Sequence, residues 1–264
     1  MIMNTTNTLK VALIQSDLVW ENPTENRKRF EKKINGLSDE IDLIVLPEMF
    51  TTGFTMNASA VAEIMEGETV QWLQNLAQEK SIAITGSIII SENNNFYNRL
   101  LFVHPSGKID SYNKKHTFTL AGEHEVFSAG TERIIIDYKG WRICPLICYD
   151  LRFPVWARNT ENYDLLLYVA SWPKPRIEAW DSLLKARAIE NMSYTIGVNR
   201  VGVDANGYEY IGNTACYDTL GNCLVKNNLG TEEILIIELN KQEQAKIRDR
   251  FCFLDDRDAF VIKK

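Results

Sequence analysis

Three polar residues stand where apolar, strand-like runs of the sequence end. Glu48 closes the run "IDLIVLPE", Cys148 closes "WRICPLIC", and Lys114 lies in "YNKKH" after a segment that reads as extended. Side chains at the carboxyl ends of strands gather at one edge of an α/β sheet, where such proteins bind small molecules. Taken singly, a helix-start carboxylate, a solvated lysine and a small buried thiol are ordinary structural residues. Their combination points to nucleophilic catalysis.

The chemistry of the three side chains is complementary. A cysteine attacks as the thiolate, and a free thiol with a pKa of about 8.5 is mostly protonated at neutral pH. It needs a base and a nearby cation, which Glu48 and Lys114 would supply. A carboxylic acid is about four pKa units more acidic than a thiol, so a carboxylate base works only where burial strengthens its hold on a proton. The backbone N–H of Tyr149 would join Lys114 in stabilising an oxyanion.

The elements that must position these residues alternate between short apolar runs and amphipathic stretches. Apolar and β-branched residues dominate the predicted strands, as in strands covered on both faces; these are residues 10–15, 41–47, 81–90, 141–148 and 163–170. Helices are predicted at residues 22–34, 68–80 and 178–191, the first with Asn22 and Pro23 at its start. Hairpin-like turns recur at "ENNN", "PSGK", "YKG" and "TLGN". The pattern predicts an α/β fold in layers, with mixed sheets covered by helices.

Composition and charge exclude several classes of partner. The 264 residues carry a formal net charge of -6, which gives no basic field for nucleic acid or for an anionic membrane. No run approaches the roughly 18 apolar residues that span a bilayer. The N-terminal "MIMNTTNTLKVALIQ" lacks the basic and apolar regions of a secretory signal. We therefore expect a cytoplasmic protein with no nucleic-acid or membrane partner.

Motifs for cofactors are missing from the sequence. No GxGxxG follows a predicted strand, and Val203 stands where the lysine of a phosphate-binding loop would be. Neither HExxH nor HxH links the three histidines, His104, His116 and His124. The SxxK spacing of Ser111 and Lys114 lies in an extended segment, where it does not bring the two side chains together. We expect no metal and no cofactor.

The five cysteines are an odd number without a regular framework, which favours free thiols. On a strand, the Cα atoms of Cys144 and Cys148 would lie roughly 13 Å apart, too far for a disulfide. Pro145 between them argues against a helix. We interpret Cys148 as the nucleophile and the other four as packing residues, namely Cys144, Cys216, Cys223 and Cys252.

Four segments in this order, "LPEMF", "YNKKH", "CYDLRFP" and "RAIEN", resemble the signature segments of the nitrilase superfamily of carbon–nitrogen hydrolases. The similarity runs over nearly the whole chain. The resemblance implies that Glu48, Lys114 and Cys148 are catalytic, and that Glu123 in "LAGEHE" orients Lys114 or assists proton transfer. It also implies a four-layer α-β-β-α sandwich formed by one domain, residues 1–264, and a homodimer. A C-terminal extension from about residue 240 would contact the partner subunit.

A finer resemblance is to the bacterial ω-amidase branch, carried by "GWRICPLICYDLRFPVWARN", "YDLLLYVASWPKPR" and "LLKARAIENMSYTIGVNRVG". That branch hydrolyses the terminal amide of 2-oxo acids such as 2-oxoglutaramate and 2-oxosuccinamate. The resemblance thus implies an amidohydrolase that releases ammonia through a cysteine thioester. Two alternatives stay open at this point: another amidase, nitrilase or carbamoyl amidohydrolase with a different small substrate, and a non-catalytic interaction protein on the same scaffold.

A 2-oxo acid monoamide requires a cation for its carboxylate, and a bidentate guanidinium suits that role best. Arg176 in "SWPKPR" and Arg152 in "DLRFP" are the candidates, and Phe54 and Trp172 would form walls of the same pocket. The structural alternatives are an ion pair of Arg152 with Asp150 or a nearby acid, a solvated helix start for Arg176, and plain core positions for the two aromatic residues.

Overall fold

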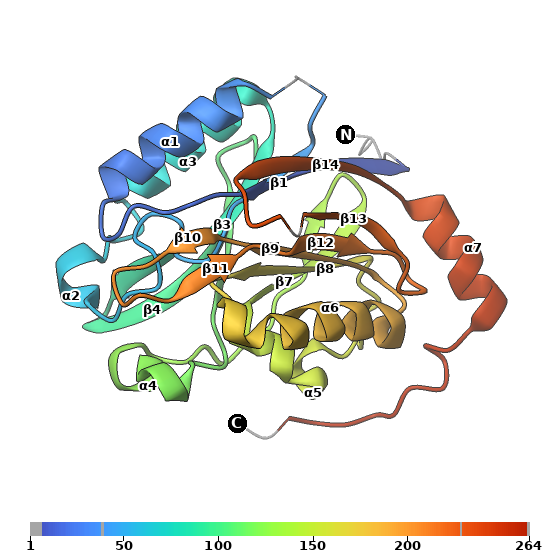
Figure 1. Cartoon of the computed structure of the whole chain (residues 1–264). Coiled ribbons are helices and arrows are strands. Elements are labelled where there is room, and N and C mark those ends of the chain that lie inside the picture. The colour runs from blue at the N-terminus through green and yellow to red at the C-terminus, as the bar shows by residue number, and fades with distance from the viewer. Residues whose placement is uncertain (1–6, 38–39, 228, 263–264) are drawn as a thin grey trace.

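The computed structural model describes residues 7–37, 40–227 and 229–262 (Figure 1). Two six-stranded sheets are formed by these residues. The first sheet contains β1 (Thr8–Gln15), β2 (Leu43–Val45), β3 (Ala83–Glu92), β4 (Asn95–Val103), β5 (Ile109–Asn113) and β14 (Glu233–Asn240). The second contains β6 (Ile136–Tyr138), β7 (Trp141–Ile147), β8 (Leu165–Ala170), β9 (Tyr194–Asn199), β12 (Thr214–Tyr217) and β13 (Cys223–Asn227). A small hairpin joins β10 (Val201–Val203) and β11 (Glu209–Ile211).

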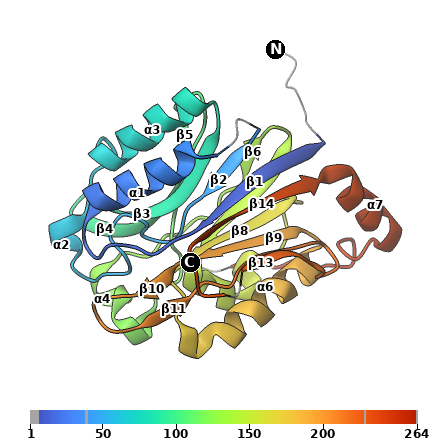
Figure 2. The same ribbon diagram turned by 45° about the horizontal axis from the view of Figure 1, so that its top comes forward.

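Helices cover the outer face of each sheet (Figures 1 and 2). On the first sheet lie α1 (Pro23–Asn35) and α3 (Glu68–Lys80), and on the second lie α5 (Pro154–Ala157) and α6 (Ile177–Asn191). Helix α6 packs so closely that a Cβ atom on Gly197 of β9 would meet Leu184 at 2.5 Å. The order helix, sheet, sheet, helix confirms the predicted four-layer α-β-β-α sandwich.

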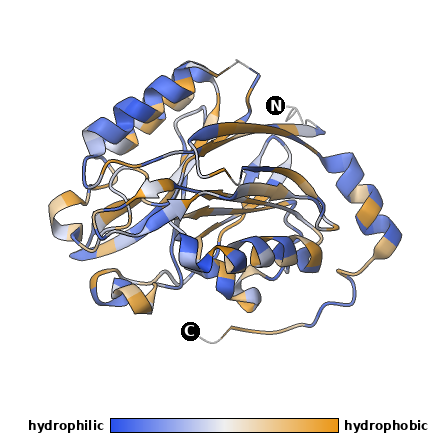
Figure 3. Cartoon of the chain, in the orientation of Figure 1, coloured by the Kyte–Doolittle hydropathy of each residue, from blue (hydrophilic) through white to orange (hydrophobic). Residues whose placement is uncertain are grey.

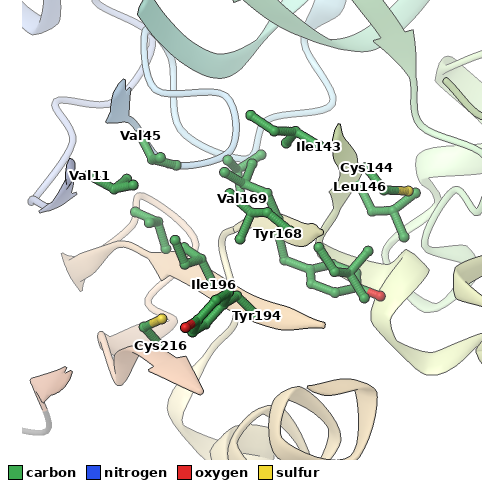
Figure 4. Packing of buried hydrophobic residues seen from close by; sticks show 14 of the residues in the cluster. Val11, Val45, Ile143, Cys144, Leu146, Tyr168, Val169, Tyr194, Ile196 and Cys216 are labelled. Atoms are coloured by element: carbon green, nitrogen blue, oxygen red, sulfur yellow. The ribbon is translucent and has the colours of Figure 1, made fainter. Parts of the chain in front are cut away.

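The main hydrophobic core lies between the two sheets (Figure 4). Val11 and Val45 of the first sheet face Ile143, Val169 and Ile196 of the second, and all five side chains are fully buried. Figure 3 shows the strands as predominantly hydrophobic and the covering helices as amphipathic. This burial on both faces explains why the strands have apolar residues throughout rather than in alternation.

The remaining helices connect these layers or follow them. They are α2 (Ala58–Val61), α4 (Glu123–Val126), α7 (Lys241–Phe251) and the 3₁₀ turns Thr119–Ala121, Cys148–Arg152 and Lys174–Arg176. The predicted strands and long helices are all present, although β2 spans only Leu43–Val45 of the expected 41–47. None of the helices in the described part of the chain is both long enough and apolar enough to cross a membrane. The N-terminal segment used for the prediction on targeting includes residues 1–6, which lie outside the described residues.

Strand direction explains how the chain can assemble one site from distant segments. In the first sheet β1, β2 and β3 are parallel, and β5 runs in the direction of β3 because both are antiparallel to β4. In the second sheet β7, β8 and β9 are parallel. The residues that follow β2, β5, β7 and β8 therefore gather at the carboxyl edges of the sheets.

Two of the cysteine predictions are wrong. Cys144 and Cys216 are buried, as expected, but Cys223 and Cys252 are exposed. Cys223 begins β13, which is an edge strand of the second sheet, and Cys252 ends α7 with a left-handed φ of 53°. Apolar neighbours in sequence therefore do not bury these two thiols. All five cysteines are free.

Candidate active site

The ends of β2, β5 and β7 deliver Glu48, Lys114 and Cys148 to one place. Lys114 Nζ donates a hydrogen bond to Glu48 Oε1 at 2.8 Å, and both side chains are fully buried. The Cys148 thiol lies beside them and interacts electrostatically with both. The structure thus brings together the three residues that the sequence singled out.

Glu123 completes the surroundings of the lysine. Both of its carboxylate oxygens accept hydrogen bonds from Lys114 Nζ, at 2.9 and 2.8 Å. The N–H of Phe118 donates to Glu123 Oε2 at 2.5 Å, which fixes the carboxylate at the start of α4. Lys114 is therefore held between two buried carboxyl groups, and a buried charge needs this kind of pairing.

Burial and charge shift the proton affinities of the site in opposite directions. Burial acts to lower the pKa of Lys114, but the carboxylates of Glu123 and Glu48 outweigh it and raise the pKa, so the ammonium stays charged. Burial raises the pKa of Glu123. The charge of Lys114 acts against this increase, and the charge of Glu48 adds to it. Burial likewise raises the pKa of the Cys148 thiol, Glu48 adds to the increase, and Lys114 opposes it. The Cys148 side chain therefore rests as a thiol, not as a thiolate.

Cys148 occupies a sharp turn between β7 and the 3₁₀ turn that it begins. Its φ of 44° is uncommon for a residue with a side chain, so the surroundings must hold it. The buried Asp150 carboxylate accepts hydrogen bonds from Ile147 N at 3.0 Å and from Tyr112 Oη at 2.8 Å. It also accepts from His116 N at 3.0 Å and lies 2.8 Å from His116 Nδ1. Asp150 therefore ties the turn at Cys148 to the segment around Lys114.

Two groups that contact Glu48 were missed in the sequence. Asn98 Nδ2 donates to Glu48 Oε1 at 2.8 Å and reaches Glu123 Oε1 at 3.3 Å. The N–H of Ser171 donates to Glu48 Oε2 at 2.8 Å. Ser171 follows β8 directly, so the reasoning applied to Glu48 and Cys148 would have found it. Asn98 lies inside β4, where no local signal marks it.

A cavity of about 580 Å³ opens onto this cluster, a volume suited to a small-molecule ligand. Cys148 and Lys114 line it, as do Tyr149 and the predicted pocket residues Phe54, Arg152, Trp172 and Arg176. Phe54 contacts the cluster directly, because Lys114 Nζ lies 5.2 Å from the centre of its ring. The N–H of Tyr149 belongs to the first turn of the 3₁₀ segment, where N–H groups have no partner within a helix.

The two arginines differ from Lys114 in their partners. Within the described residues neither Arg152 nor Arg176 forms an ion pair with an acid, whereas Lys114 has two. The Arg152 guanidinium lies 4.9 Å from the Trp172 ring centre, and that of Arg176 lies 5.1 Å from Phe118. The alternative ion pair between Arg152 and Asp150 does not form. Both arginines therefore present cations to the cavity.

The family model of carbon–nitrogen hydrolases matches residues 10–249 of the chain. The chain belongs to the carbon–nitrogen hydrolase family. This hydrolase is 44% identical to the omega-amidase YafV of Yersinia enterocolitica, over 97% of this chain and 99% of the relative. It is 41% identical to omega-amidase YafV of Escherichia coli strain K12, over 96% and 98% of the two chains. It is 35% identical to a 2-oxoglutaramate amidase of Bacillus subtilis, over 93% and 96%.

Solved structures agree on the fold of this carbon–nitrogen hydrolase. The superfamily member XC1258 of Xanthomonas campestris, which carries an arsenic adduct in its active site, is 40% identical and superposes with a TM-score of 0.95, over 97% of this chain and 99% of that one. Nit3 of Saccharomyces cerevisiae, a nitrilase-superfamily protein, is 26% identical with a TM-score of 0.83, over 92% and 94%. The predicted superfamily and its layered sandwich are confirmed.

Proposed function

We propose that this carbon–nitrogen hydrolase is an ω-amidase, which releases ammonia from the terminal amide of small 2-oxo acid monoamides such as 2-oxoglutaramate and 2-oxosuccinamate. The observation that carries the proposal is one cavity lined both by Cys148 and Lys114, which cluster with the buried Glu48, and by two arginines without acid partners among the described residues. Relatives named as omega-amidases and as a 2-oxoglutaramate amidase align along almost their whole length, which supports the same conclusion.

In the first half of the reaction Glu48 takes the proton of the Cys148 thiol, and the thiolate attacks the amide carbon. The carbonyl oxygen becomes negatively charged, and Lys114 together with the N–H of Tyr149 stabilises it. The carbon–nitrogen bond then breaks, and protonated Glu48 gives its proton to the leaving nitrogen. Ammonia departs and the acyl group remains on Cys148 as a thioester.

In the second half a water molecule replaces the ammonia. Glu48 takes a proton from the water as it attacks the thioester carbon, and Lys114 and the Tyr149 N–H again hold the oxyanion. The carbon–sulfur bond breaks, the carboxylic acid product leaves, and Cys148 recovers its proton. Glu123 takes no part in bond breaking in this scheme, because both of its oxygens hold the Lys114 ammonium.

The substrate assignment is tested by measuring ammonia release from 2-oxoglutaramate, 2-oxosuccinamate, glutamine and a simple nitrile. We expect the two 2-oxo amides to have the highest kcat/KM, because each offers a carboxylate to the cavity arginines without the positive charge of an amino group. If wild-type protein hydrolyses a different amide or the nitrile and neither 2-oxo amide, the substrate assignment is wrong and the family alone stands.

Replacing Arg176 by methionine is expected to raise the KM for 2-oxoglutaramate at least about tenfold, since a charge-assisted hydrogen bond contributes about 1.5–3 kcal/mol. The variant keeps an unbranched apolar side chain and removes the guanidinium, which lies over Phe118. The matched control is Lys174→Met, because Lys174 is exposed and pairs with Glu209. The same KM measurement on Arg152→Met tests whether Arg152 also binds the substrate carboxylate. If neither arginine variant changes the KM, the carboxylate is held elsewhere.

The homodimer and the cytoplasmic location stay predictions, as do the single domain over residues 1–264 and the contact of its C-terminal extension with a partner. After α7 the chain runs on without helix or strand to Ile262 (Figure 1). Phe253 is 56% exposed and Val261 is 89% exposed in this segment. Large apolar side chains in solvent are what a segment that contacts a second subunit would present, which supports the dimer prediction.

A further inference from the structure

The residue pair that follows β8, Ser171 and Trp172, is fixed at its backbone. Ser171 N–H donates to Glu48 Oε2 at 2.8 Å. Trp172 N–H donates to Asn199 Oδ1 at 2.7 Å, and Asn199 Nδ2 donates back to Trp172 O at 2.9 Å. Asn199 is itself fully buried and also donates to Gly212 O at 2.7 Å. The main chain at Trp172 therefore has a set position relative to the proposed base, Glu48.

The Trp172 side chain contacts both cavity arginines. It is only 3% exposed, and its ring packs on Trp180 with the ring centres 5.6 Å apart. The indole Nε1–H donates to the carbonyl oxygen of Arg176 at 2.7 Å, which holds the 3₁₀ turn Lys174–Arg176. The guanidinium of Arg152 lies over the ring, 4.9 Å from its centre, in a cation–π contact.

We infer that Trp172 is a positioning residue that fixes Arg152 and Arg176 relative to Glu48 and Cys148, and so sets the affinity of the cavity for anionic amides. The inference rests on the proposed function, because it takes the two arginines as the carboxylate site. Trp172 then does more than form a wall of the cavity. Its backbone is connected to the catalytic cluster through the neighbouring Ser171, and its side chain contacts each of the two arginines.

The physical reason is pre-organisation. An arginine side chain has about 2 kcal/mol of rotamer entropy, and a cation that is ordered before the substrate arrives loses less on binding. Trp172 orders Arg152 through its ring and the Arg176 turn through its indole N–H. An uncharged amide gains nothing from the arginines, so its binding should not depend on Trp172 in the same way.

The substitution Trp172→Phe separates these roles, because phenylalanine keeps an aromatic ring and removes the indole N–H. Steady-state kinetics would use 2-oxoglutaramate and its uncharged methyl ester, which has the same chain without the negative charge. We expect the KM for 2-oxoglutaramate to rise by up to about tenfold, the upper end of what the loss of one hydrogen bond between neutral groups accounts for. The KM for the ester and the kcat for both should change less than about twofold.

The matched control is Trp180→Phe. Trp180 is a fully buried neighbour whose indole N–H donates to Asn213 O at 2.9 Å, so the change removes the same kind of bond without contacting either arginine. An equal rise of the KM for 2-oxoglutaramate in both variants would mean general loosening and would overturn the inference. Equal effects of Trp172→Phe on the anionic amide and on its ester would overturn it as well.

A binding measurement separates this inference from the proposed reaction. The ligand for calorimetry is 2-oxoglutarate, a dicarboxylate and the expected product. Three proteins are compared: Cys148→Ala alone, Cys148→Ala with Trp172→Phe, and Cys148→Ala with Trp180→Phe. We expect the Kd to rise by up to about tenfold with Trp172→Phe alone. An unchanged Kd, or no binding of 2-oxoglutarate at all, overturns the role of Trp172. Failure of wild-type protein to hydrolyse 2-oxoglutaramate overturns the proposed function, whatever the Kd values are.

Discussion

Replacing Cys148 by alanine is expected to lower kcat for amide hydrolysis by at least about 10⁴-fold, the loss typical when a nucleophile is removed. The thiol lies at the cavity beside Glu48 and Lys114, and no other cysteine lines that cavity within the described residues. Alanine is smaller than cysteine and adopts the same backbone, so the fold should survive. Ammonia release, with circular dichroism to verify the fold, makes the measurement.

The control for this variant is Cys144→Ala. Cys144 lies four residues earlier on β7, is fully buried in the core, and burial raises the pKa of its thiol to about 12. It is therefore an inert packing residue, and its loss should reduce stability by about 1 kcal/mol while kcat changes little. If the Cys148→Ala variant retains more than a few per cent of wild-type activity, Cys148 is not the nucleophile.

The layers of the fold were predictable because their cause is local. Apolar runs such as residues 81–90 and 163–170 are bounded by turns and separated by amphipathic stretches, and burial on both faces is the condition that produces that pattern. The β3–β4 hairpin at Asn93 and Asn94, with φ of 51° and 61°, follows the same local logic. The pairing of strands into two stacked sheets came from the family resemblance.

The candidate site was predictable where a residue ends a strand and less so elsewhere. Lys114 and Cys148 follow strands directly, Glu48 comes three residues after the end of β2, and chemistry explains their grouping. Asn98 was not predicted because it lies within β4 and not at a strand end. It reaches the site because β4 pairs with the segment that ends at Lys114, whose N–H donates to Asn98 O at 3.0 Å. Cross-strand register of this kind depends on long-range pairing, which local patterns do not report.

The pocket residues show a different limit of sequence reasoning. Arg152 is close to Asp150 in sequence, so an ion pair was a natural alternative, yet the turn that begins at Cys148 directs the Asp150 carboxylate to Tyr112 and His116. The guanidinium instead lies over Trp172, a residue of the loop after β8. Which cations remain unpaired in a cavity is decided by such turns, and the pairing is visible only once the chain is folded.

Replacing Glu48 by glutamine is expected to change amide hydrolysis and thiol reactivity in opposite directions. Glutamine has the same shape but cannot take the thiol proton, so kcat should fall about 10³-fold, within the range for general acid–base catalysis. Burial is the largest cause that raises the pKa of Cys148. The charge and the hydrogen bond of Glu48 raise it further, whereas the charge of Lys114 lowers it. Without Glu48 the pKa of the thiol therefore falls, and alkylation by iodoacetamide should become faster at neutral pH.

The opposition of the two effects makes the experiment decisive. A variant that merely disturbs the site would slow both reactions, whereas loss of the base alone slows hydrolysis and leaves Lys114 free to stabilise the thiolate. Lys114 keeps its bond to Glu123 in this variant, so its positive charge persists. Glu40→Gln is the matched control, because Glu40 is exposed and pairs with Lys10. Slower alkylation in Glu48→Gln, or hydrolysis within tenfold of wild type, would show that Glu48 is not the base that activates Cys148.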